Sequence, residues 1–119
     1  MKEGVKMDRE IFSSMLTNEN VHHFSKEERG EFISKSILKC GDCGKIKLTV
    51  LTEELAELIQ EVTKIIRGKY KGVGLLEELA DVLISIEYLK EICDISEDEI
   101  KFIDSEIISL QSSRWNNDK

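Results

Sequence analysis

The sequence predicts an all-α protein, and three observations support this prediction. The 119 residues contain no proline, so long helices can run without the breaks that this residue causes. Apolar residues recur with helical spacing over long segments of the chain. Two capping boxes, in which a glutamate follows a serine by three residues, mark helix starts at Ser25 and Ser96. A chain of this length with this pattern predicts one helical domain.

Four helices are expected, each with an apolar face. The first begins after Ser25 and ends near Gly41, and its inward residues are Phe32, Ile33, Ile37 and Leu38. The second spans residues 45–67, with a narrow seam of heptad spacing formed by Leu48, Leu51, Leu55, Leu58, Val62 and Ile65. The third spans residues 75–92, with a buried stripe of Leu75, Leu76, Leu79, Leu83, Ile86 and Leu89. The fourth begins after Ser96 and carries Ile100, Ile103, Ile107 and Leu110.

The chain divides into three parts by pattern. Residues 1–24 are weakly patterned, with a short helix as one interpretation of residues 8–16. Residues 25–111 form the predicted helical domain. Residues 112–119 are a polar tail, which we expect to fray.

Composition excludes several classes of protein. The net charge of -7 argues against a general nucleic-acid binder, which usually presents a basic face. The apolar runs are too short for a transmembrane helix. The first six residues lack the apolar segment of a signal peptide. Three cysteines, an odd number, fit a reducing compartment, so we expect a cytoplasmic protein without a membrane or nucleic-acid partner.

Two short acidic strings are the most informative feature of the chain. Residues 53–57 read Glu-Glu-Leu-Ala-Glu, and residues 77–81 read Glu-Glu-Leu-Ala-Asp. Carboxylates three and four residues apart lie on one helix surface, where like charges cost a few tenths of a kcal/mol per pair. If the two helices pack antiparallel, as their short connection favours, the acids at the shoulders of the two apolar stripes can meet. One or two hard cations would then be held by Glu54, Glu57, Glu78 and Asp81, and Mg²⁺ suits such oxygen ligands.

A solvated acidic face is the alternative interpretation, since glutamate is a strong helix former and is common on exposed helix surfaces. Within three turns of the second helix, however, four glutamates have Lys64 as their only obvious partner. The recurrence of the crowding on two consecutive helices favours a metal site.

These residues resemble a known family. Glu-Glu-x-x-Glu at 53–57, followed by Glu-x-x-Asp at 78–81, is similar to the signature of the MazG-like all-α nucleoside triphosphate pyrophosphohydrolases. The flanking residues also resemble the family, with Leu51-Thr52 before the first string and Val82-Leu83-Ile84 after the second. The resemblance covers residues 30–110 and is closest to the small, single-domain, phage-type members.

The resemblance implies a fold, a reaction and residue roles. The fold would be a four-helix MazG-like bundle assembled as a dimer or a dimer of dimers. The reaction would split an NTP or dNTP between the α- and β-phosphates, with Mg²⁺, or Mn²⁺ as the alternative, as cofactor. The implied metal ligands are Glu54, Glu57, Glu78 and Asp81. Glu53 would orient or deprotonate the attacking water.

The triphosphate also needs cations from the protein. Lys64, Arg67 and Lys69 follow the first acidic string and are the expected phosphate-binding residues. Favourable contacts with the negative end of the helix are the alternative explanation for these three residues. Lys45 and Lys47, at the start of the second helix, are weaker candidates.

Two other metal centres are disfavoured. Cys40 and Cys43 have the spacing of half a zinc site, but the remaining candidate ligands, Cys93, His22 and His23, have no ordered spacing. A di-iron bundle needs Glu-x-x-His on two helices, and no such motif occurs in the acidic helices.

Two other functions stay open. The helices could form a non-catalytic module that binds a nucleotide or a protein, or a regulator, although the acidic charge disfavours direct DNA binding. The base and sugar preference of an enzyme is not readable from the sequence.

Overall fold

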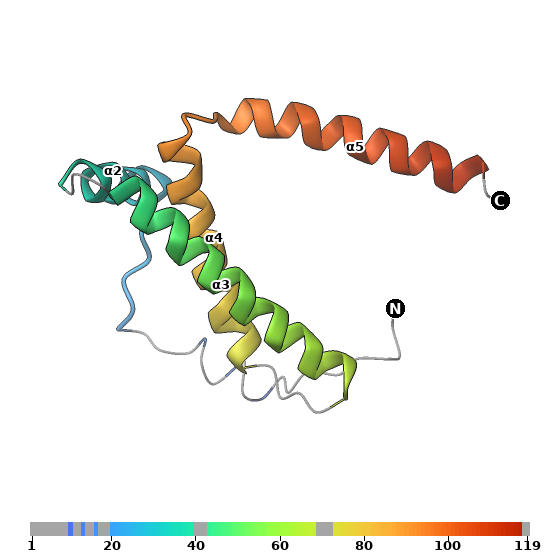
Figure 1. Cartoon of the computed structure of the whole chain (residues 1–119), viewed down its shortest axis with the longest axis horizontal. Coiled ribbons are helices and arrows are strands. Elements are labelled where there is room, and N and C mark those ends of the chain that lie inside the picture. Colours follow the sequence, from blue (N-terminus) through green and yellow to red (C-terminus); the bar gives the residue numbers. More distant parts are fainter. Residues whose placement is uncertain are drawn as a thin grey trace.

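The computed structural model describes residues 20–39, 43–68 and 73–117, together with residues 10, 13 and 16 and with the side chains of Cys43 and Val73 excepted. Within these residues the chain is all-helical, as predicted, and contains no strand. Its helices are α2 (Lys26–Leu38), α3 (Cys43–Ile66), α4 (Val73–Ile92) and α5 (Glu97–Asn117) (Figure 1). Most of the short helix expected at residues 8–16 lies outside the described residues, as do Cys40 and Lys69.

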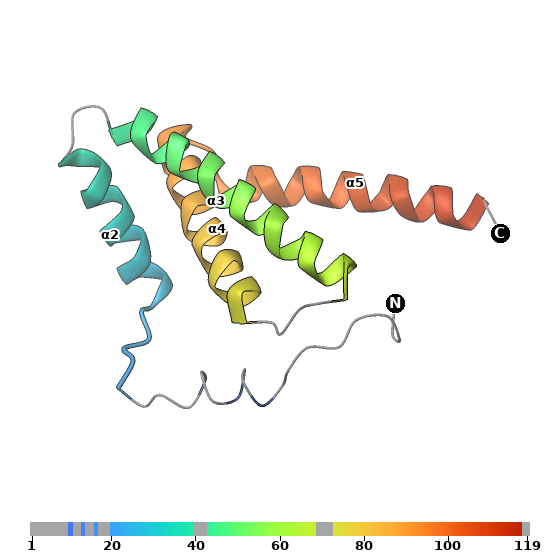
Figure 2. The same ribbon diagram turned by 60° about the horizontal axis from the view of Figure 1, so that its bottom comes forward.

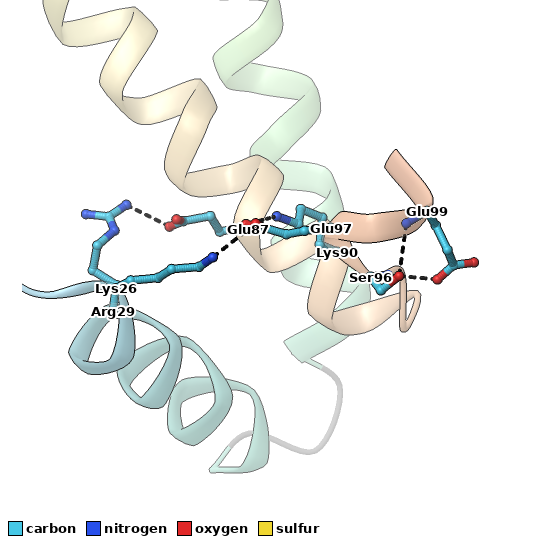
Figure 3. Close-up of polar contacts among 7 residues, drawn as sticks. All are labelled: Lys26, Arg29, Glu87, Lys90, Ser96, Glu97 and Glu99. Atoms are coloured by element: carbon cyan, nitrogen blue, oxygen red, sulfur yellow. Dashed lines mark hydrogen bonds and ion pairs between the residues drawn. The ribbon is translucent and has the colours of Figure 1, made fainter. Parts of the chain in front are cut away.

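Both predicted capping boxes are present. The Glu28 amide donates to Ser25 Oγ at 3.1 Å, and the Ser25 amide donates to Glu28 Oε1 at 2.9 Å. The same reciprocal pair joins Ser96 and Glu99, at 3.1 and 2.9 Å, at the start of α5 (Figure 3). These bonds satisfy amide groups that a helix start otherwise leaves without partners, and they explain why both helices begin where the sequence predicts.

Helices α3 and α4 run antiparallel and side by side, and they form the centre of the molecule (Figures 1 and 2). A row on α3 with heptad spacing is half-buried in this contact: Lys47, Leu51, Glu54, Leu58, Glu61 and Ile65. The predicted seam is therefore only half correct. Leu51, Leu58 and Ile65 belong to the contact, whereas Leu48, Leu55 and Val62 are exposed. The face of α3 that contacts α4 is therefore rotated from the predicted seam toward Glu54 and Glu61.

Helix α4 is also rotated relative to its predicted stripe. Its buried residues are Val82, Ser85 and Tyr88, whereas Leu79 and Leu83 of the predicted stripe are exposed. Val82, Ser85 and Tyr88 continue the helical row that starts at the half-buried Glu78. The rotation has a clear consequence, because it carries an acidic side chain into the contact between the two central helices.

Helix α2 packs against α4 along one ridge, where Ile33 is buried. Arg29 Nη2 donates to Glu87 Oε2 at 2.7 Å beside it (Figure 3). The prediction that Phe32 and Leu38 face inward is wrong, because both are exposed. Helix α2 packs mainly on α4 and buries one narrow stripe, and these two residues lie outside it. The helix also ends at Leu38, before the predicted stop near Gly41.

Helix α5 extends away from the α3/α4 pair (Figures 1 and 2). Its first turn is attached through Glu97, which accepts from Lys26 and Lys90, both at 3.1 Å (Figure 3). None of its residues is buried, so the apolar face that carries Ile100, Ile103, Ile107 and Leu110 is exposed in the single chain. The expected fraying after residue 111 is wrong, because the helix continues to Asn117. No glycine or proline interrupts residues 97–117, which explains the length of this helix.

Among the helices described, none is long and apolar enough to cross a membrane.

Candidate metal centre

Three carboxylates converge where α3 and α4 pack together. One oxygen atom of each of Glu54, Glu78 and Asp81 lies within 4.8 Å of the other two. Glu54 belongs to the α3 row that faces α4, and Glu78 belongs to the α4 row that faces α3. Asp81 follows Glu78 by three residues, so it lies on the same side of α4, and it is exposed. The group therefore has a half-buried base and an open edge.

The burial of this group leaves carboxylate oxygens without partners. Glu54 Oε2 and Glu78 Oε2 are buried, and neither accepts a hydrogen bond from the described residues. A buried carboxylate oxygen without a donor is energetically costly unless a cation compensates it. Clustered carboxylate oxygens are the ligands that hard divalent cations such as Mg²⁺ prefer, so the residues present fit such an ion.

The predicted fourth ligand, Glu57, lies close to the same group. Burial raises the pKa of Glu78 to about 7, and the nearby Glu57 and Glu54 carboxyls contribute to this shift. Burial also raises the pKa of Glu54, with further contributions from the negative charges of Glu57 and Asp81. The Glu57 oxygens do not belong to the set within 4.8 Å. The structure therefore brings three of the four predicted ligands within 4.8 Å of one another, and Glu57 is near enough to act on the pKa values of Glu54 and Glu78.

The other predicted site residues that the structure describes, Glu53, Lys64 and Arg67, do not belong to the set of three converging carboxylates. Glu53 directly precedes Glu54 in the sequence, and its side chain is exposed. Lys64 Nζ donates to Glu61 Oε1 at 3.2 Å, which engages this lysine in a local ion pair. Arg67 is exposed just beyond the end of α3. Lys69, the remaining expected phosphate ligand, lies outside the described residues.

A cavity of about 240 Å³ adjoins the acids. Glu54 and Asp81 form one part of its wall, and the rest is lined by Lys47, Val50, Ile84, Ser85 and Tyr88. The ammonium of Lys47 lies 4.3 Å from the centroid of the Tyr88 ring. Sequence reasoning gave no role to Ser85 and ranked Lys47 low. The spacing of Lys47 could have indicated its place near the acids, because Lys47 precedes Glu54 by seven residues and so occupies the same face of α3.

The chain matches no protein-family model, no curated protein and no solved structure. The fold and the site together define an all-α protein with a carboxylate cluster that could hold a metal ion. The particular activity must be inferred from the chemistry of the site and from the motif resemblance.

Proposed function

We propose that the protein is a Mg²⁺-dependent, MazG-like nucleoside triphosphate pyrophosphohydrolase, which converts an NTP or dNTP to the monophosphate and pyrophosphate. One observation carries the proposal, namely the convergence of Glu54, Glu78 and Asp81 oxygens within 4.8 Å. The order of the acids along the chain, which resembles the family signature, supports it. Mn²⁺ is the alternative ion, since it also accepts carboxylate ligands.

The burial of the acids argues for this proposal over a solvated acidic face. Solvation would favour carboxylates on the outer surface of each helix, in contact with water. Glu54 and Glu78 instead occupy the rows through which α3 and α4 pack, where leucine or valine would stabilise the contact. The resulting cost is offset when a cation binds, which gives these acids a functional explanation.

The residues have distinct roles in the proposed reaction. Glu54, Glu57, Glu78 and Asp81 would hold the ion. A bound divalent cation would neutralise phosphate charge, polarise the scissile phosphoryl group and lower the pKa of a water molecule. Glu53, which is exposed and precedes Glu54 in the sequence, would accept a proton from the water that attacks the α-phosphorus. The bond from the α-phosphorus to the bridging oxygen then breaks, and pyrophosphate leaves with the bond electrons.

The decisive experiment measures pyrophosphate release from each common NTP and dNTP. We expect Mg²⁺-dependent turnover of at least one of them, its abolition by EDTA, and a loss of about 100-fold or more in Glu54→Gln and Asp81→Asn. Glu106→Gln, on exposed α5, is the matched control and should retain full activity. Folded protein that turns over none of these nucleotides, with a melting temperature that Mg²⁺ leaves unchanged, would refute the proposal.

The proposed enzyme is a homo-oligomer, because α3 presents a second apolar row that no described residue covers. We define this row as the open face: Leu48, Thr52, Leu55, Ile59, Val62 and Ile66, all exposed and spaced by four, three, four, three and four residues. It lies about 100° round the helix from the row that packs on α4. Leu79 and Leu83, exposed on α4, add further apolar surface to the molecule.

The open face is suited to burial against a second copy of the chain. Its threonine hydroxyl is already satisfied, since Thr52 donates to the Leu48 carbonyl at 3.1 Å. The neighbouring hydroxyls of Thr49 and Thr63 likewise donate to the carbonyls four residues earlier, both at 2.9 Å. No charged side chain belongs to the open face, so covering it requires no desolvation of a charge. A continuous apolar row that is exposed in the single chain favours a symmetric helix-to-helix dimer.

A further inference from the structure

The cavity beside the acids is lined by a positively charged side chain, Lys47, to which the proposed function gives no role. A nucleoside triphosphate carries more negative charge than one divalent ion neutralises, so its distal phosphates need a positive group near the metal. Lys64 and Arg67 do not line this cavity, and Lys64 is paired with Glu61. Lys47 does line it, together with Glu54 and Asp81.

Lys47 is placed to receive an anion. It is half-buried on α3, two helical turns before Glu54, and it forms no ion pair with a described residue. Its ammonium lies over the Tyr88 ring, 4.3 Å from the centroid, and Tyr88 itself is buried. A ring face holds a lysine by a weak attraction, and an anionic oxygen is a stronger partner for the same ammonium.

Ser85 supplies a second, independent observation. It is only 6% exposed and lines the cavity, one helical turn after Asp81. Several hydroxyls on α2 and α3 donate to the carbonyl four residues earlier, as Ser36 does to the Phe32 carbonyl at 2.8 Å. The Ser85 hydroxyl makes no such bond within the described part of the chain. Because Ser85 lines the cavity, its hydroxyl can donate to a ligand there.

We propose that Lys47 and Ser85 form the subsite for the distal phosphates of the metal-bound nucleotide. The Lys47 ammonium supplies charge, the Ser85 hydroxyl donates a hydrogen bond, and the Tyr88 ring holds the lysine in place. This inference rests on the proposed function and adds to it the orientation of the bound nucleotide. The departing pyrophosphate lies toward Lys47, at the start of α3, and the nucleoside lies toward the other end of the acid cluster.

Binding of inorganic pyrophosphate to the full chain tests this subsite directly. Calorimetric titration in the presence of Mg²⁺ should give an affinity between about 10- and 100-fold weaker for Lys47→Met than for the wild type. Methionine retains an apolar stem beside Tyr88 while it removes the charge. Lys47→Arg should restore most of the affinity, and Ser85→Ala should weaken binding about two- to tenfold. Mg²⁺ binding alone should be the same in all four proteins.

Lys45→Met is the matched control, because Lys45 is an exposed lysine two residues away that does not line the cavity. It should bind pyrophosphate like the wild type. The KM for the nucleotide should rise in Lys47→Met by the same factor as the pyrophosphate affinity falls, since the lost contact is to the phosphates. Equal pyrophosphate affinity of Lys47→Met and wild type would overturn the subsite. Failure of the proposed function would be seen differently, as wild-type protein that binds neither Mg²⁺ nor the nucleotide.

Discussion

The carboxylate of Glu61 occupies the space next to Gly74 that any larger residue would need. A Cβ atom at position 74 would lie 2.6 Å from Glu61 Oε1. Gly74 is the second residue of α4, so the Glu61 carboxylate lies at the positive end of that helix, where a negative charge is favoured. Glu61 thus connects α3 to the start of α4, one helical turn beyond Glu57. We expect this contact to fix the register of the two helices that carry the metal ligands.

The effect of Gly74→Ala on the free energy of unfolding should therefore depend on Glu61. Replacing a helical glycine by alanine normally stabilises a helix by about 1 kcal/mol. In the wild type, displacement of the Glu61 carboxylate should reduce this gain. In a Glu61→Ala background, the same substitution should be stabilising. Urea unfolding of the four proteins in this double-mutant cycle gives the coupling free energy.

Gly30 offers the control for this cycle. It lies inside α2, and a Cβ atom there would meet nothing within 4 Å. Gly30→Ala should be stabilising, by about 0.5–1 kcal/mol, whether or not Glu61 is present. An identical effect of Gly74→Ala in both backgrounds would show that the contact has no energetic weight.

The metal-free protein should lose stability as the pH rises toward neutrality. The pKa of Glu78 is raised to about 7 and that of Glu54 is also raised, so the folded state binds more protons than the unfolded chain. The stability that Glu78 contributes is fully present below its unfolded pKa of 4.5 and is lost as the pH rises through its folded pKa of about 7. Glu54 acts in the same direction. Glu28, Glu31, Glu97 and Glu99 have lowered pKa values, so their contribution falls away only as the pH drops below this window.

Thermal unfolding in EDTA between about pH 5 and 8 measures this dependence, and Glu78→Gln should flatten it. Mg²⁺ should raise the melting temperature most at the upper end of the range, because only deprotonated carboxylates bind the ion well. A melting temperature that stays constant across the range in EDTA would contradict the raised pKa values.

Features that depend on neighbouring residues in the sequence were predictable, whereas features that depend on tertiary packing were not. The starts of α2 and α5 follow from capping boxes, in which all partners lie within four residues. The convergence of Glu54, Glu78 and Asp81 follows from the spacing of the acids on two antiparallel helices. The rotation of α4 was not predictable in this way, because its leucines surround much of the helix and several stripes are equally apolar. The burial of Val82 and Ser85 in place of Leu79 and Leu83 depends on which face meets α3.

Helix α5 also shows that local structure was predictable from the sequence and tertiary packing was not. Its length depends on helix-forming residues and on the absence of breakers, which are local properties. Burial of Ile100 and Ile103 would require a surface to pack against, and none of the residues of α5 is buried in the single chain. Ser85 was missed because a lone serine carries no spacing signal, and only its burial beside a cavity singles it out.

Ile33 should contribute most of the stability with which α2 packs on α4. Its side chain is 6% exposed, whereas the adjacent Phe32 is 63% exposed. We expect Ile33→Ala to lower the free energy of unfolding by about 2–4 kcal/mol, since it removes buried methyl groups and leaves a cavity. Phe32→Ala, the matched control, should cost about 0.5 kcal/mol or less. Chemical denaturation checks both, and equal effects would contradict the observed orientation of α2.

A charge in the open face of α3 should separate the proposed oligomer. Ile59 is 65% exposed at the middle of that row, and in a dimer it would be buried against the partner. Ile59→Glu would place a carboxylate in the apolar interface, where its desolvation is unfavourable. We expect light scattering after gel filtration to give a dimer or larger assembly for the wild type and a monomer for this variant.

The neighbouring polar position supplies the control for the oligomer. Gln60→Glu adds the same charge one residue away, on a side of α3 that is outside the open face, and it should leave the assembly intact. Because the open face and the α4-facing row lie about 100° apart, the monomeric variant should still bind Mg²⁺ through its acids. A wild-type chain that is monomeric at all concentrations tested would refute the oligomer while leaving the metal centre unaffected. Loss of Mg²⁺ binding on dissociation would instead mean that the second copy completes the site.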